Sequence, residues 1–191
     1  MSERDAAWVV VETAWSAERL DQFLNDVQRL YRLNPFLEFI RWEEGPQGFQ
    51  AELLNHSNGQ RVLLDARMTR ESALALRVDY VQGPKRSTRF EVASTSGGSR
   101  LTVTEEYAHD APTAPEQVDR SLHAWGVALK DYLARDLRWG RLPLYRWFME
   151  QVWLPMKPSA RRITFVVLVV SVADIALIVL GLTIYWLEAG R

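Results

Sequence analysis

The sequence predicts an α+β fold in which an antiparallel sheet packs against a long C-terminal helix, followed by a single transmembrane helix. Three observations lead to this prediction. Six short runs between residues 38 and 108 are rich in strand-forming side chains and are separated by turn sequences such as EGPQG and TSGGS. Residues 115–139 carry an apolar stripe at three- and four-residue spacing. Residues 163–187 form one apolar run, long enough to cross a bilayer.

The N-terminal segment is expected to supply one strand and two short helices. Residues 6–15, AAWVVVETAW, are β-branched and aromatic, which favours a strand. Ser16 follows this strand and can cap a helix over residues 17–27. A second helix over residues 28–33 should end before Pro35, because the residue before a proline avoids helical backbone angles.

The six central runs are predicted to form an antiparallel meander, because only short turns connect them. The expected strands are residues 38–43, 48–54, 61–70, 73–81, 87–94 and 100–108. Successive side chains of a strand point to opposite faces, so alternation assigns one apolar face to the sheet. That face comprises Val62, Leu64, Ala66, Met68, Leu74, Leu76, Val78, Tyr80, Thr88, Phe90, Val92, Leu101, Val103, Glu105 and Tyr107.

An apolar sheet face needs a cover, and the helix predicted over residues 115–139 can supply it. Pro115 suits the first turn of a helix. The stripe comprises Val118, Leu122, Trp125, Leu129, Tyr132, Leu133 and Leu137. We expect these side chains to pack on the apolar face of the sheet.

The order of these elements resembles the START-like or SRPBCC superfamily, which has the helix-grip fold and includes polyketide cyclases and coenzyme Q-binding proteins. The segment Val9–Ile40 looks like the start of bacterial members, and the closing helix with Trp125 and Leu129 also matches. The likeness covers residues 6–139 and rests on the order of patterns, without an invariant catalytic motif. It implies a START-like domain over residues 1–139, with a bent sheet wrapped round the long helix and a cavity between them for a hydrophobic ligand.

The side chains expected to line this cavity come from both the sheet and the helix. They are Leu64, Met68, Leu76, Val78, Tyr80, Phe90, Val103, Glu105, Tyr107, Trp125 and Leu129. Strict alternation would aim Glu105 at the apolar side, where a desolvated carboxyl group could act as an acid or orient a ligand hydroxyl. We favour the alternative, a bulge near the strand end that turns Glu105 to water, because buried carboxylates are uncommon unless they are paired.

Other kinds of site find no support in the sequence. The chain has no cysteine, and His56, His109 and His123 show no metal-ligand spacing, so we assign no metal and no cofactor. His56 and His109 fall in turns, where solvated side chains are expected. Residues 1–137 carry a net charge of −5, which argues against nucleic-acid binding. We identify no catalytic residue.

Residues 140–162 form a basic, aromatic neck before the span. From Arg138 to Arg162 there are six basic residues and one acidic residue, so the positive-inside rule places the N-terminal domain in the cytoplasm and Arg191 on the far side. The polar segment Met1–Asp5 does not resemble a signal peptide and agrees with this orientation. Residues 142–154 have the composition of an interfacial amphipathic helix; the alternative is that they pack on the globular domain.

Asp174 lies near the middle of the predicted span, where an ionisable side chain costs at least about 2.5 kcal/mol. We expect it to contact a transmembrane partner helix; the alternative is a protonated carboxyl group tolerated in a strongly apolar helix. The sequence leaves three hypotheses for function. The first is a single-pass, membrane-tethered module that binds a lipid, an isoprenoid or a quinone on the cytoplasmic face. The second is an accessory subunit of a membrane complex, and the third is a cyclase-like enzyme.

Overall fold

A computed structural model describes residues 6–83, 85–107 and 115–189, and at residues 115–120, 162 and 189 it describes the backbone alone. The chain divides into two compact units, Met1–Pro155 and Met156–Arg191. The first unit contains β1 Ala6–Thr13, α1 Ala17–Leu24, α2 Val27–Arg32, β2 Leu37–Gly45, β3 Gly48–Asn55, β4 Gln60–Ser72, β5 Ala75–Tyr80, β6 Lys85–Thr95, β7 Gly98–Tyr107, α3 Pro115–Trp139, α4 Pro143–Trp147 and the π-helix η2 Phe148–Trp153. The second unit contains α5 Pro158–Ala189.

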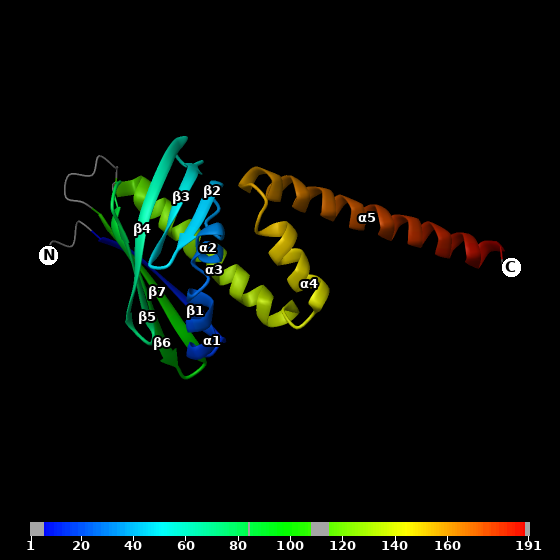
Figure 1. Ribbon diagram of the computed structural model, residues 1–191. Coiled ribbons are helices and arrows are strands. Elements are labelled where there is room, and N and C mark those ends of the chain that lie inside the picture. The colour runs from blue at the N-terminus through cyan, green and yellow to red at the C-terminus, as the bar shows by residue number, and fades with distance from the viewer. Residues whose placement is uncertain (1–5, 84, 108–114, 190–191) are drawn as a thin grey trace. The chain divides into compact units, whose positions relative to one another are not determined.

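The seven strands form one antiparallel sheet in the order β1-β7-β6-β5-β4-β3-β2 (Figure 1). This order confirms the predicted meander from β2 to β7. It adds β1, which pairs with the last strand so that Val9 lies opposite Val103. Register shifts in β2, β4 and β6 mark bulges, which bend and twist a sheet. The result is the predicted α+β, helix-grip architecture.

Side-chain caps define the two short helices. Ser16 Oγ accepts a hydrogen bond from the backbone N–H of Arg19 at 3.3 Å, as the sequence predicts for α1. The first helix ends earlier than predicted, at Leu24, because Asp26 caps a new helix by accepting from the backbone N–H of Arg29 at 2.9 Å. The two predicted helices are therefore present, but the break between them lies at residues 25–26, before the predicted boundary between residues 27 and 28.

Helix α3 has the predicted bounds and buries the predicted stripe over most of its length. Leu122, Trp125, Leu129, Tyr132 and Leu133 are buried, whereas the side chain of Val118 lies outside the described residues. Leu137 is wrongly predicted to be buried, since it is 39% exposed near the end of the helix. Gly126 lets α3 approach β1 closely, because a Cβ atom there would lie 2.4 Å from Cγ2 of Val9.

Residues 142–154 of the neck pack on the globular domain, so the prediction of a free interfacial helix there is wrong and the alternative holds. Met149 and Leu154 are buried and belong to the core cluster of the domain. Arg29 of α2 also donates to Glu150 of η2 at 3.4 Å. In η2, the N–H of Leu154 bonds the carbonyl of Met149 at 2.9 Å, a wider turn that changes which side chains share a face. Trp139, Leu142, Leu144 and Trp147 remain exposed.

Helix α5 is apolar on every side. An 18-residue window of the helix over Pro158–Glu188 has a mean hydropathy of 2.9, and this is the one helix of the described chain that is long and apolar enough to cross a membrane. Its side chains from Phe165 to Leu187 are exposed within this chain. The helix begins five residues before the predicted span, at Pro158, which suits a first turn.

Candidate ligand site on the inner face of the sheet

The centre of the inner face is filled by aromatic rings from four elements. Tyr31 of α2 lies 5.3 Å from the ring centroid of Trp125, 5.6 Å from Phe49 and 6.5 Å from Phe90. Phe90 meets Trp125 edge to face at 5.8 Å. The indole N–H of Trp125 donates to the carbonyl of Leu30 at 3.0 Å, so its polar atom is satisfied. These contacts fix α2 and α3 against the sheet.

Hydroxyl groups gather beside this aromatic cluster. The hydroxyl of Tyr80 bonds Oγ1 of Thr88 at 2.9 Å and also bonds the hydroxyl of Tyr31. Burial raises the pKa of Tyr31 and that of Tyr80 above the ordinary tyrosine value. Both phenols therefore stay protonated at neutral pH and keep their capacity to donate a hydrogen bond.

A buried carboxylate continues this group of polar side chains. Thr88 lies directly opposite Glu105 in the sheet, and the Glu105 side chain is 2% exposed. Glu105 accepts from the hydroxyl of Tyr107 and forms an ion pair with Lys85. Burial and the neighbouring charge of Glu105 raise the pKa of Tyr107, which keeps this phenol a donor.

The expectation that a bulge turns Glu105 to water is therefore wrong. The bulge lies on the neighbouring strand, between Lys85 and Ser87 of β6. It places Lys85, instead of Arg86, opposite Tyr107. Glu105 keeps its alternating position and points inward, where Lys85 and Tyr107 supply the partners that a buried carboxylate needs.

The inner face is less covered on the side of β2 and β4. Its side chains on β5, β6 and β7 are mostly buried, whereas apolar side chains on the other wing are half-buried. These half-buried side chains, here called the open strip, are Leu37, Phe39, Trp42, Leu64 and Met68. The open strip borders Tyr80, since Ala66 and Met68 of β4 pair with Tyr80 and Val78 of β5.

The structure brings the predicted cavity residues to one face. Leu76, Val78, Phe90, Val103, Glu105, Trp125 and Leu129 are buried, and Leu64, Met68, Tyr80 and Tyr107 are half-buried. The sequence analysis missed Tyr31 and Lys85. The helical spacing of Val27, Leu30 and Tyr31 could have indicated that Tyr31 points inward. The inward position of Lys85 depends on the bulge in β6, which no sequence pattern predicts.

The histidines add no metal site to this face. Within the described ranges, no three His, Cys, Asp or Glu side chains are placed to hold a metal ion. His56 lies in a turn, where its Nε2 is 2.8 Å from Oε2 of Glu38, and His123 is exposed on α3. His109 lies outside the described residues.

No protein-family model and no curated protein matches the chain. Solved structures match over about 70% of it. An aromatase/cyclase, Zhui, from Streptomyces sp. R1128 has a TM-score of 0.54 at 15% identity, covering 71% of this chain and 96% of its own. A START superfamily protein from Mycobacterium smegmatis has a TM-score of 0.53 at 16% identity, with coverages of 69% and 98%. The chain has a START-like fold.

A third structure similar to this START-like domain, a protein from Chromobacterium violaceum, has a TM-score of 0.51 at 19% identity, with coverages of 68% and 96%. Identities this low establish the fold and leave function to be argued from the site. The evidence for the function of this START-like domain therefore comes from its open strip and its buried polar side chains.

Proposed function

We propose that the START-like domain binds an apolar molecule with a polar end, and that α5 holds the domain at the cytoplasmic face of a membrane. The observation that carries the proposal is the open strip, which leaves apolar side chains of the concave inner face half-exposed next to buried hydroxyls. Ligand sites are typically concave and apolar, with a few placed polar groups that fix orientation. A lipid, an isoprenoid or a quinone combines these two properties.

The polar end of the ligand is assigned to the hydroxyls of Tyr80 and Thr88. The Tyr80 hydroxyl already bonds Thr88 and Tyr31, and a ligand carbonyl or hydroxyl could exchange for one of these partners. Glu105 lies opposite Thr88 on the neighbouring strand and accepts hydrogen bonds from Tyr107 and Lys85. In this proposal the polar side chains orient the ligand without making or breaking a covalent bond. The proposed function is therefore binding and not catalysis.

A membrane tether would favour binding of such a ligand because it keeps the domain close to the bilayer that holds the ligand. An apolar molecule resides in the bilayer, and a domain attached to that bilayer meets it at a raised effective concentration. Helix α5 has the length and composition for a tether. The basic residues that precede its apolar run, including Lys157 and Arg161, favour the cytoplasmic side.

The test is the content of the purified full-length chain. We expect mass spectrometry of protein extracted in mild detergent to detect a retained apolar molecule in stoichiometric amount. Leu64→Gln should reduce this amount severalfold, because Leu64 lies on the open strip. Leu63→Gln is the matched control, since Leu63 is next to Leu64 in β4 but points to the outer face and is 69% exposed. No retained molecule in the wild type, or equal retention in both variants, would contradict the proposal.

Asp174 favours a second candidate function, that of an accessory subunit in a membrane complex. A carboxyl group in the middle of an apolar helix normally faces a partner. In this alternative the START-like domain is carried into a complex by α5, and its ligand site is vestigial. The two candidates differ in what the purified chain retains: a small apolar molecule or an integral-membrane protein.

A further inference from the structure

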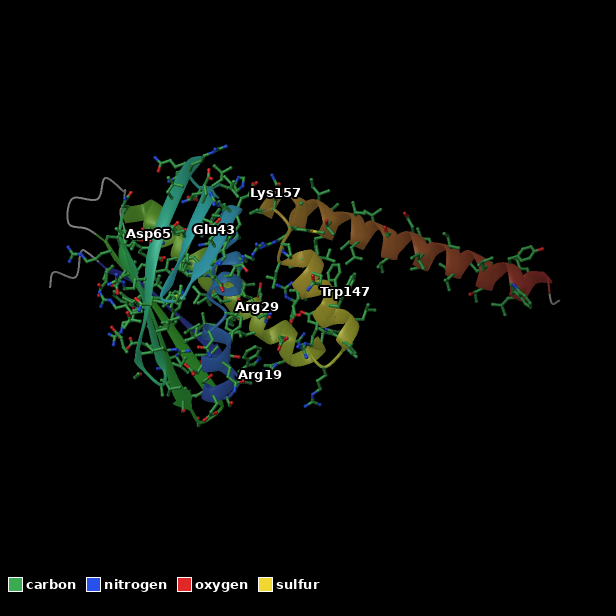
Figure 2. All side chains as sticks on the ribbon, viewed as in Figure 1. Arg19, Arg29, Glu43, Asp65, Trp147 and Lys157 are labelled. Carbon is green, nitrogen blue, oxygen red and sulfur yellow. The ribbon has the colours of Figure 1, made fainter. Side chains whose placement is uncertain are left out.

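A groove lies on the helical side of the START-like domain, away from the open strip. It has a volume of about 450 Å³ and is walled by α1, α2, the end of α3 and the neck elements α4 and η2. Sites for small molecules typically have volumes of about 300–1,000 Å³. Figure 2 shows two of the lining side chains, Arg19 projecting from α1 and Arg29 from α2.

Two buried donors in the lining of this groove have no hydrogen-bond partner in the described part of the chain. Trp15 is 5% exposed, and its indole N–H has no hydrogen-bond partner among the residues that the structure describes. The buried hydroxyl of Tyr145 likewise finds no partner within the described chain. Burial also raises the pKa of Tyr145, so the hydroxyl keeps its proton at neutral pH. Because an unsatisfied buried donor is costly, a bound group that accepts from both would remove this cost.

The charged side chains of the groove are mainly cationic. Its lining carries three guanidinium groups and two carboxylates, from Arg19, Arg29, Arg146, Asp136 and Glu150. The carboxylates hold the arginines in place: Asp136 pairs with Arg19, and Glu150 lies 3.4 Å from Arg29 and 4.0 Å from Arg146. The Arg19 guanidinium also stacks 3.9 Å from the ring centroid of Trp15.

We propose that this groove is a second binding site, which takes a phosphate group. An indole N–H can only donate, and each guanidinium offers five donors in a fixed fork, so the occupant must be an acceptor with several oxygens. A cation could use none of these donors. The carboxylates are already engaged by the arginines, which leaves an anion as the complement of the site.

Two sources can supply such a group, a lipid headgroup or a soluble phosphate ester. The wall residue Glu150 precedes Ile163 by thirteen residues, which span at most about 45 Å when extended. This chain length limits the separation between the groove wall and the start of the apolar run, so a lipid headgroup is one source to test. The inference stands apart from the proposed apolar ligand, because the lining of the groove includes none of the residues of the open strip.

The experiment uses the full-length chain in dodecylmaltoside micelles and isothermal titration calorimetry. One titrant is dihexanoyl phosphatidic acid and the other is glycerol 3-phosphate. We expect saturable binding of at least one of them, and about tenfold weaker binding in Trp15→Phe and in Tyr145→Phe, since each loses one hydrogen bond to a charged group. The thermal midpoint of Tyr145→Phe should not fall, because the deleted hydroxyl has no protein partner among the described residues. Trp15→Phe also loses ring contacts with Phe23 and Arg19, so a lower midpoint is expected for this variant alone.

Two further variants make the result decisive. Trp8→Phe is the matched control, because Trp8 is 64% exposed on the outer face of β1, and its binding should equal that of the wild type. Arg146→Gln removes an exposed guanidinium whose distance to Glu150 is long, 4.0 Å, so the variant should fold normally. It should bind the titrant several times more weakly than the wild type. It replaces Trp15→Phe as the test if that variant fails to fold.

The two titrants separate the two sources. Binding of phosphatidic acid alone assigns a lipid headgroup, whereas equal binding of both assigns a soluble ester, and either outcome supports a phosphate site. The proposal is overturned if neither titrant binds the wild type. It is also overturned if the folded groove variants bind both titrants as tightly as Trp8→Phe.

Discussion

Lys85 forms an ion pair with Glu105 across two neighbouring strands, and the Glu105 side chain is 2% exposed while that of Lys85 is 34% exposed. The pair thus joins a buried carboxylate to an amine that reaches the protein surface. The Tyr107 hydroxyl donates a further bond to the carboxylate. Such a pair holds an acidic group inside an apolar face only while each partner remains.

Lys85→Met should therefore lower the free energy of unfolding by about 1–3 kcal/mol, because it leaves a buried charge with one hydrogen bond fewer. The double variant Lys85→Met/Glu105→Gln should regain much of this loss, since an amide carries no charge to compensate. Urea unfolding of the full chain in detergent, followed by circular dichroism at a wavelength dominated by the sheet, measures both.

The matched control for this pair is Arg41→Met. Arg41 pairs with Glu43 on β2, but both side chains are well exposed, and exposed pairs contribute less than about 1 kcal/mol. If Lys85→Met destabilises the domain no more than this control, the prediction is wrong. The ion pair of Lys85 with Glu105 then contributes no more to stability than an exposed pair.

Truncation tests the packing of the neck. Residues 1–139 end before Met149 and Leu154, which are buried in the core cluster, whereas residues 1–155 retain them. Burying one such side chain stabilises a domain by about 1.5–3 kcal/mol. We expect the fragment 1–155 to unfold at a clearly higher urea concentration than the fragment 1–139. Equal midpoints would mean that α4 and η2 contribute nothing to the stability of the domain.

The approach of α3 to β1 makes a double-variant prediction. Gly126→Ala should destabilise the domain by about 1–3 kcal/mol, because the new methyl group would overlap the Val9 side chain. Val9→Ala alone should also destabilise it, by leaving a cavity. The two changes together should cost less than the sum of the single costs, since each relieves the other. Additive unfolding free energies would contradict this close contact.

The fold could be predicted from the sequence because its main signals are local. Turn residues between alternating runs predicted β2 to β7, and the stripe from Leu122 to Leu133 predicted the face of α3. The pairing of β1 with β7 is a contact between distant segments and leaves no periodic trace. The burial of Met149 likewise depends on the π-helix η2, whose wider turn departs from the 3.6-residue period.

The candidate site could be predicted only in its apolar part. Alternation placed Leu76, Val78, Phe90 and Val103 on one face, and they lie there. The polar part depended on Lys85, which reaches Glu105 through a one-residue bulge that shifts the register of β6. The groove on the helical side was missed because its walls come from five separate helices, and no local sequence pattern indicates that they meet.

The orientation of the proposed membrane tether can be tested directly. The basic residues from Arg138 to Arg162 precede the span, so we expect a reporter fused at residue 1 to lie in the cytosol and one at residue 191 to lie outside it. Protease protection of intact and opened membrane vesicles measures this. Both reporters on the same side would show that α5 does not cross the membrane.

Asp174 provides the last test, which separates a tether from a subunit of a complex. Asp174→Leu should insert into the membrane as well as the wild type or better, because it removes an insertion cost of at least about 2.5 kcal/mol. If Asp174 bonds a partner helix, the same change should weaken that association. Interhelical polar contacts contribute about 0.6–2 kcal/mol each, so partial loss is expected.

The matched variant for this test is Asp174→Asn, whose amide still donates and accepts hydrogen bonds. It should retain much of the association that Asp174→Leu loses. Co-purification of the three full-length chains from mild detergent, compared at equal expression, measures the difference. Complexes of equal composition and yield from all three would show that the carboxyl group is tolerated in α5 without a partner, because a contact that survives the loss of every polar atom at Asp174 cannot depend on it.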